Sequence, residues 1–171
     1  MNNKPKITIV GAGYVGTSLG ILLSQKNEVS IHDIDQKKVD LINKRKTHLK
    51  EKKIKSFLSK KKLSLTASND FERLVRKTNY LVICTSTNFN PKTNDFDTSI
   101  VEQVIKNTRK LNKSCLIIIR STVPVGFTSR MQKKFRTKSI IFSPEFLREG
   151  SSIDDNLYPS RIIVGSESKK G

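Results

Sequence analysis

Short apolar runs alternate along the chain with longer stretches in which apolar residues recur every three or four positions. The runs, such as ITIV, LVIC and LIIIR, have the length of strands, and most are rich in β-branched residues. The pattern predicts strands at 6–10, 28–33, 63–66, 79–84, 114–120, 139–142 and 161–165. It predicts helices at 14–26, 35–46, 51–61, 70–77, 97–111 and 126–135. Apolar strands that alternate with helices are typical of an α/β fold, so we expect a doubly wound, mostly parallel sheet covered on both faces.

A glycine motif follows the first predicted strand and opens the first predicted helix. Residues 11–16 read Gly-Ala-Gly-Tyr-Val-Gly, and Asp33 ends the next strand twenty residues after Gly13. In this context Gly11 permits a tight turn, Gly13 lets the backbone approach a pyrophosphate, and Gly16 lets the helix pack closely on the sheet. The motif predicts a dinucleotide-binding domain of Rossmann type.

The type of dinucleotide follows from Asp33. The helix after the glycine loop offers free N–H groups and the positive end of its dipole to the phosphates. The Asp33 carboxylate can accept hydrogen bonds from the ribose hydroxyls, whereas a 2′-phosphate at this point would meet a negative charge. We therefore expect NAD rather than NADP as the cofactor.

Length and composition indicate one domain. The chain has 171 residues, which suits a single core, and we expect the domain to cover 1–165, with 166–171 as a polar tail or the start of a linker. No apolar run approaches the roughly 20 residues of a membrane span, and the first residues lack the apolar stretch of a secretory signal. We expect a cytoplasmic protein with no membrane partner.

Cysteines and histidines give no sign of a metal site. Cys84 and Cys115 each lie inside an apolar run, which favours reduced thiols in the core. Neither has the spacing of a metal ligand, and the two histidines, His32 and His48, form no cluster. We expect no metal.

The net charge of +18 leaves two interpretations open. Ten Lys or Arg residues lie within 44–62, against the single acid Glu51. Such a tract can bind nucleic acid, but no aromatic residues are interleaved as a stacking platform. We favour a solvated helical face over nucleic-acid binding. The charge can also attract an anionic small molecule.

Polar segments follow three of the predicted strands. They are 85–88 (Thr-Ser-Thr-Asn), 121–124 (Ser-Thr-Val-Pro) and 143–150 (Ser-Pro-Glu-Phe-Leu-Arg-Glu-Gly). The carboxyl ends of parallel strands meet at one edge of a sheet, where ligands bind in open α/β folds. A threonine in such a segment is often only a helix cap or a turn residue. Three polar segments at the same edge as the glycine loop favour a second ligand site there.

Four motifs carry a resemblance to a known family. They are GAGYVG at 11–16, STVPVG at 121–126, FSPEFLREG at 142–150 and NLYPSRIIVG at 156–165. Over essentially its whole length the sequence resembles the UDP-glucose/GDP-mannose dehydrogenase family. The Phe-Leu-Arg-Glu form of the third motif is similar to the branches that oxidise UDP-glucose and GDP-mannose, and NLYPSR is similar to the short bacterial UDP-glucose enzymes.

The resemblance implies a reaction and a set of site residues. Members oxidise the sugar C6 alcohol to a carboxylate in two NAD-dependent steps, through an aldehyde and a cysteine-bound thioester. Together with the glycine motif, the resemblance implies cofactor contacts at Gly11, Gly13, Tyr14, Val15, Gly16, Asp33, Lys38, Thr87, Thr122 and Glu149. It implies substrate contacts at Glu145, Phe146, Leu147, Arg148 and Glu149. Thr122 and Glu145 are expected to handle the catalytic water or proton.

UDP-glucose is the expected substrate, and two alternatives stay open. One is a GDP-mannose dehydrogenase domain, and the other is a binding module for NAD or a nucleotide sugar that performs no chemistry. Three departures from the family pattern bear on this choice. Ser86 and His48 each replace a proline, and the nucleophilic cysteine, catalytic lysine and dimer-forming helix of the family fall beyond the equivalent of Gly171. We expect a homodimeric parent protein, of which this part alone does not complete the oxidation.

Overall fold

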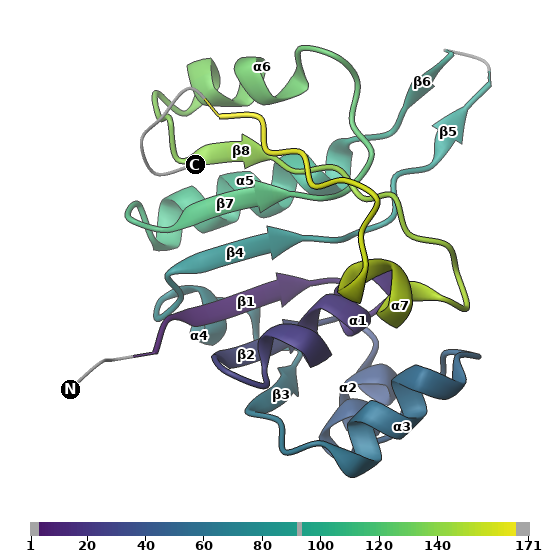
Figure 1. The fold of residues 1–171 in the computed structure, drawn as a ribbon. Coiled ribbons are helices and arrows are strands. Elements are labelled where there is room, and N and C mark those ends of the chain that lie inside the picture. The colour runs from purple at the N-terminus through teal and green to yellow at the C-terminus, as the bar shows by residue number, and fades with distance from the viewer. Residues whose placement is uncertain (1–3, 92–93, 167–171) are drawn as a thin grey trace.

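A six-stranded parallel sheet forms the centre of the molecule. The computed structural model describes residues 4–91 and 94–166, and Figure 1 shows these strands side by side in the order β3-β2-β1-β4-β7-β8. Their bounds are β1 (Lys6–Val10), β2 (Glu28–His32), β3 (Leu65–Ser68), β4 (Tyr80–Ile83), β7 (Leu116–Ile119) and β8 (Ile140–Phe142). The chain builds outward from β1 in one direction and then returns to β4 on its other side, which creates a topological switch point between β1 and β4. The predicted doubly wound, Rossmann-type fold is confirmed.

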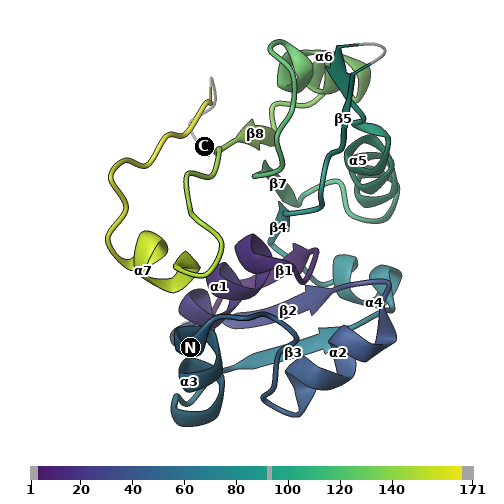
Figure 2. The same cartoon turned by 90° about the vertical axis from the view of Figure 1, so that its right-hand side faces the viewer.

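Helices cover both faces of this sheet. They are α1 (Tyr14–Leu23), α2 (Gln36–Asn43), α3 (Lys52–Lys60), α4 (Phe71–Val75), α5 (Ser99–Leu111), α6 (Phe127–Lys134) and α7 (Ser152–Leu157). The helices α1, α3 and α7 gather on one side of the sheet in Figure 2, and α4 and α5 lie on the other. Each predicted helix is present, with ends that differ by a few residues.

The strands are apolar on both faces because each face has its own core. In β4, Val82 belongs to the core under α1, α3 and α7, whereas Leu81 and Ile83 belong to the core under α4, α5 and α6. In β1, Ile9 and Val10 divide in the same way. Successive side chains of a strand point to opposite faces, so a strand buried on both sides reads as a continuous apolar run.

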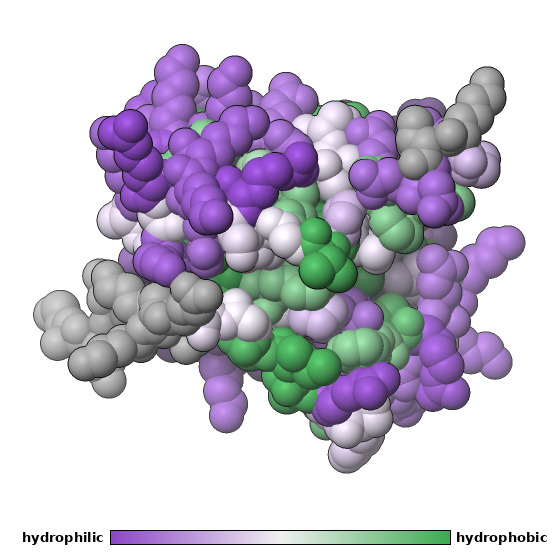
Figure 3. Space-filling view, turned by 90° about the horizontal axis from the view of Figure 1, so that it is seen from above, coloured by the Kyte–Doolittle hydropathy of each residue, from purple (hydrophilic) through white to green (hydrophobic). Residues whose placement is uncertain are grey.

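The prediction of a strand at 161–165 is wrong. Phe142 and Gly165 form only an isolated antiparallel bridge, with N···O distances of 2.8 and 3.3 Å. Ile162 and Val164 are 75% and 51% exposed, so apolar composition here does not reflect burial in the sheet. Figure 3 shows the molecule from above relative to Figure 1, and on that face apolar side chains gather among hydrophilic ones.

Two short elements were not expected. The helix α7 (Ser152–Leu157) lies in a polar stretch, and β5 (Phe89–Asn90) pairs with β6 (Asp95–Phe96) as a small antiparallel hairpin. The third strand is 65–68, two residues later than the pattern predicts. Of the predicted tail at 166–171, only Ser166 lies within the described residues. None of the described helices has the length and apolarity needed to cross a membrane.

Candidate functional site

A cavity of about 820 Å³ lies at the carboxyl ends of the strands, beside the switch point. Its walls come from the glycine loop after β1, the end of β2, the polar segments after β4 and β7, one side of α5, and the segment after β8. The expected site residues that line it are Gly11, Gly13, Tyr14, Val15, Asp33, Lys38, Thr87, Thr122, Glu145, Leu147 and Glu149. Gly16, Phe146 and Arg148 are not among its lining residues.

The three motif glycines have different geometric roles. Gly11 has φ +107°, and a Cβ atom there would lie 2.6 Å from the carbonyl oxygen of Cys84. A Cβ at Gly16 would lie 2.0 Å from the carbonyl oxygen of Gly11, so Gly16 is needed for close packing of α1. A Cβ at Gly13 would meet nothing within 4 Å. Gly13 therefore leaves open space on the cavity side, where a ligand can approach the backbone.

Asp33 fastens the end of β2 to the glycine loop. Its Oδ2 accepts a hydrogen bond of 2.8 Å from the backbone N–H of Ala12, and its Oδ1 accepts one of 3.0 Å from Asp35. The ammonium of Lys38 lies 3.7 Å from Oδ2. Asp33 is 9% exposed and lines the cavity, so the lone pairs that remain can face a ligand.

His32 lies beside Asp33 in the cavity wall and was not expected as a site residue. Its Nδ1 is 3.2 Å from the carbonyl oxygen of Ser68, and its ring meets that of Phe71 edge-on at 5.2 Å. Burial lowers the pKa of His32, against smaller opposing effects of Ser68 and Asp33. The imidazole is therefore a neutral wall of the site at neutral pH.

The polar segments after β4 and β7 are joined by Ser121. Its hydroxyl donates a 2.6 Å hydrogen bond to the carbonyl oxygen of Thr85 and is itself 6% exposed. Thr122, the next residue, is exposed and lines the cavity together with Thr87. The structure thus brings the two expected threonines to one ligand-facing wall, and Ser121 fixes the spacing of their segments.

Glu145 lies in a loop, but its carboxylate is fixed by an ion pair and two hydrogen bonds. Its Oε2 pairs with the guanidinium of Arg120, and its Oε1 accepts hydrogen bonds of 2.7 and 3.1 Å from the backbone N–H groups of Phe146 and Leu147. The side chains of Arg120 and Glu145 are each 16% exposed. Sequence reasoning missed Arg120, although its place at the end of an apolar run, before the Ser-Thr-Val-Pro motif, marks it as the charged end of a buried strand.

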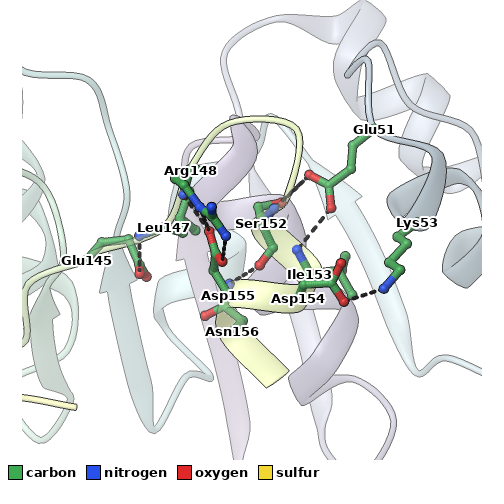
Figure 4. Close-up of polar contacts among 10 residues, drawn as sticks. All are labelled: Glu51, Lys53, Glu145, Leu147, Arg148, Ser152, Ile153, Asp154, Asp155 and Asn156. Carbon is green, nitrogen blue, oxygen red and sulfur yellow. Dashed lines mark hydrogen bonds and ion pairs between the residues drawn. The ribbon is translucent and has the colours of Figure 1, made fainter. Parts of the chain in front are cut away.

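The segment after β8 divides its side chains between the cavity and the surface. Leu147 and Glu149 line the cavity. Phe146 is 44% exposed, with the guanidinium of Arg161 4.3 Å from its ring centre. Arg148 turns to Asp155 on α7, as Figure 4 shows, and its Nη2 lies 2.8 Å from Oδ1. Arg148 therefore ties the loop to α7, whereas Leu147 and Glu149 line the cavity.

Neither cysteine has the environment of a nucleophile. Desolvation by burial raises the pKa of Cys84 to about 12, although the nearby Arg120 opposes this effect. Burial likewise raises the pKa of Cys115 to about 11. Both are free thiols; Cys115 is buried in the core as predicted, whereas Cys84 is half-buried and lines the cavity. No group of three metal-ligating side chains occurs in the described ranges 4–91 and 94–166.

Part of the basic tract at 44–62 serves the fold. The guanidinium of Arg45 donates hydrogen bonds of 3.0 and 2.9 Å to the carbonyl oxygens of Leu63 and Leu65. Lys53 pairs with Asp154 on α7. These contacts, with the buried apolar side of α3, support the interpretation of the tract as a solvated helical face.

Comparison with known proteins places the chain in a family. Residues 5–171 match the model of the UDP-glucose/GDP-mannose dehydrogenase family, NAD binding domain. A UDP-glucose 6-dehydrogenase of Streptococcus pneumoniae is 48% identical over 95% of this chain and 41% of its own length. One of Campylobacter jejuni is 43% identical over 97% of this chain and 43% of its own length.

Solved structures agree with this placement. A ternary complex of GDP-mannose dehydrogenase from Pseudomonas aeruginosa superposes with a TM-score of 0.83 and 28% identity, over 96% of this chain and 41% of that one. This chain spans about two-fifths of the length of the curated relatives it matches. The chain belongs to the UDP-glucose/GDP-mannose dehydrogenase family and contains its NAD-binding domain.

Proposed function

We propose that this chain binds NAD in the cavity at the switch point and forms the cofactor side of an NAD-dependent UDP-glucose 6-dehydrogenase, which makes UDP-glucuronate. One observation carries the proposal: a buried acid, a glycine loop with open space at Gly13, and the segment of Glu145 and Glu149 share one cavity. The first two features suit a dinucleotide, and the third suits the alcohol that it oxidises.

The residues fit NAD in a defined order along the cavity. Asp33 and Lys38 would hold the adenosine ribose, and the N–H groups at the start of α1 would bind the phosphates. Gly13 keeps the space between them open. Thr87, Thr122 and Glu149 line the cavity in the segments after β4, β7 and β8 and would hold the nicotinamide end. When bound there, NAD supplies the hydride acceptor for the oxidation of an alcohol.

Glu145 and Thr122 are proposed as the catalytic residues of this chain. Both line the cavity, Thr122 in the segment after β7 and Glu145 in the segment after β8. A carboxylate at Glu145 can take or return a proton through a water, and the Thr122 hydroxyl can orient that water. Arg120 holds the carboxylate in a fixed place, which keeps it ready for this role.

The substrate is proposed from the relatives. UDP-glucose 6-dehydrogenases from Streptococcus pneumoniae and Campylobacter jejuni share 48% and 43% of their aligned residues with this chain. The formal charge of +18 favours an anionic ligand such as a nucleotide sugar. From the resemblance to the family as a whole we also propose a cytoplasmic, homodimeric enzyme of greater length. The structural match to GDP-mannose dehydrogenase keeps GDP-mannose as the second candidate.

Titration calorimetry of the chain with NAD and NADP tests the cofactor assignment. We expect NAD to bind and NADP to bind more weakly, because a 2′-phosphate would enter beside the Asp33 carboxylate. Equal affinities for the two cofactors would overturn the role given to Asp33. A chain that binds no dinucleotide but retains UDP-glucose would favour the nucleotide-sugar binding module.

A further inference from the structure

The wall that carries Leu147 and Glu149 has no regular structure of its own. Residues 143–151 connect β8 to α7 without forming a helix or strand. At one end Ser143 is fixed to the sheet by a 2.9 Å hydrogen bond from its N–H to the carbonyl oxygen of Ile119. The other end leads into α7 (Ser152–Leu157), a helix of six residues, so the position of this end depends on the position of α7. A helix so short needs tertiary contacts to hold it.

Glu51 supplies the main polar contact to the start of α7. Its Oε2 accepts hydrogen bonds of 2.9 Å from the N–H and 2.7 Å from the hydroxyl of Ser152, and its Oε1 accepts one of 3.0 Å from the N–H of Ile153 (Figure 4). The residue before the helix, Ser151, makes no side-chain cap of its own. A residue about a hundred positions earlier in the chain therefore provides the cap that the local sequence lacks.

The burial of this contact makes it strong. Glu51 is 3% exposed, and Ser152 and Ile153 are each 0% exposed. A buried carboxylate is costly unless its lone pairs are satisfied, and here three donors and the positive end of a helix dipole meet it. Lys53 with Asp154 and Asn156 with Ser18 (2.9 Å) add outer ties between α7 and its neighbours.

The same stretch of chain also reaches the cofactor wall. The N–H of Lys50 donates a 3.3 Å hydrogen bond to the hydroxyl of Tyr14, which lines the cavity at the start of α1. Lys50 and Glu51 are neighbours, so two adjacent residues contact the glycine-loop helix on one side and α7 on the other. They join the wall after β1 to the wall after β8.

We propose that Glu51 is a positioning residue that, by anchoring α7, sets Leu147 and Glu149 against the nicotinamide half of the cofactor. The inference rests on the proposed function, because it takes this cavity to be the NAD site. It assigns a role to the single acid of the basic tract, and that role is exerted through α7 rather than by contact with ligand. The Glu51 side chain contacts α7 and not the glycine-loop helix, so its loss should affect mainly the part of NAD that reaches the loop.

Comparison of NAD with ADP-ribose tests this split. ADP-ribose keeps the adenosine, ribose and pyrophosphate but has no nicotinamide, so it does not need the loop of Leu147 and Glu149. Glu51→Gln replaces one carboxylate oxygen with an amide N–H₂ group. This group cannot accept a hydrogen bond from α7 and would face the donors there. We expect the dissociation constant for NAD to rise about tenfold and that for ADP-ribose to change by less than about twofold, both by calorimetry. Hydrogen exchange at the Arg148 amide, which donates to Asp155 on α7, should also accelerate.

Glu28→Gln is the matched control. It makes the same chemical change at an exposed acid that lies 3.8 Å from Lys6, away from the cavity. Both dissociation constants should stay within about twofold of the wild type. Ser152→Ala offers a milder change if Glu51→Gln folds poorly, because it removes one of the three donors. It should raise the NAD constant about threefold and leave that of ADP-ribose unchanged.

The outcomes separate this inference from the proposed function. Equal weakening of NAD and ADP-ribose, or no weakening of NAD, would overturn the positioning role while leaving NAD binding intact. A wild-type chain that binds neither ligand would overturn the proposed function, and this inference with it. The split between the two ligands is the result that a general loss of stability does not produce.

Discussion

Two of the walls of the cavity, the one after β1 and the one after β8, are built in different ways. The wall after β1 consists of backbone and glycine, and its central contact joins Asp33 to Ala12, only 21 residues apart. The wall after β8 consists of side chains on an irregular segment, which is held by Arg120, directly after β7, and by Glu51 from 101 residues away. The first wall is the one that we propose for the cofactor, whereas the second carries the residues that we propose to contact the reacting sugar.

This difference predicts where substitutions act. A change in the wall after β1 should weaken the binding of NAD with little effect on chemistry at bound substrate. A change in the wall after β8 should alter turnover most, because the proposed roles of its groups are exerted on the reacting atoms in the transition state. The predictions below follow in order of expected size.

Glu145→Gln should give the largest effect, on turnover. In a full-length enzyme that contains this domain, we expect the rate to fall by about 10²–10⁴-fold, the usual range for a general acid–base group. The amide keeps the shape but loses the ion pair with Arg120, so unfolding should also become easier by about 1–3 kcal/mol. Steady-state kinetics and thermal melts measure the two effects.

A matched control for that substitution is Glu102→Gln. Glu102 pairs with Arg130 and Lys134 at 3.0 and 3.2 Å but does not line the cavity. Its rate should stay near that of the wild type. If Glu145→Gln turned over as fast as this control, Glu145 would leave the list of catalytic residues.

Asp33→Ala should weaken NAD binding by about 1–3 kcal/mol, the scale of lost charge-assisted hydrogen bonds. The preference for NAD over NADP should also shrink, because the substitution removes the carboxylate that repels a 2′-phosphate and leaves the Lys38 ammonium unpaired by Asp33. Calorimetry with both cofactors measures each change. Asp35→Ala, which removes a neighbouring acid that caps α2, should leave NAD affinity within about twofold. Unchanged NAD affinity in Asp33→Ala would contradict the assigned ribose contact.

The wall after β1 was the more predictable of the two for a physical reason. The turn at Gly11, the packing at Gly16 and the acid at Asp33 all follow from short-range requirements of a strand, a turn and a helix. The sheet was predictable for the same reason, since a strand buried on both faces must be apolar throughout.

The wall after β8 depends on contacts that sequence spacing does not reveal. Nothing near Glu51 shows that it caps a helix formed by residues 152–157, and that helix is too short and polar to be recognised from its pattern. At 161–165 the error is the opposite, because a strand was predicted where none forms. The stretch has the composition of a strand, but only Gly165 is paired with β8. The pairing of Glu145 with Arg120 likewise became visible only once the strands were placed.

The smallest predicted effect concerns pH and the wall beside Asp33. Burial lowers the pKa of His32, so the unfolded chain binds a proton more readily than the folded one. The contribution of the neutral His32 to the free energy of unfolding is complete above the ordinary histidine pKa of about 6.5. It is lost as the pH falls toward the lower pKa of His32 in the folded chain. The melting temperature should therefore drop on acidification. In His32→Gln the drop should be smaller, and an identical drop would contradict the role of His32.

The central claim is that the glycine loop, through the open space at Gly13, receives the pyrophosphate of NAD. Gly13→Val tests it most directly, because a Cβ at Gly13 meets no protein atom within 4 Å and the residue lines the cavity. Calorimetry with NAD, beside a thermal melt to verify folding, is the measurement. We predict a folded variant whose NAD affinity is lower by at least about a hundredfold, the scale of losing several charge-assisted phosphate contacts. A folded Gly13→Val chain that binds NAD as tightly as the wild type would contradict the claim.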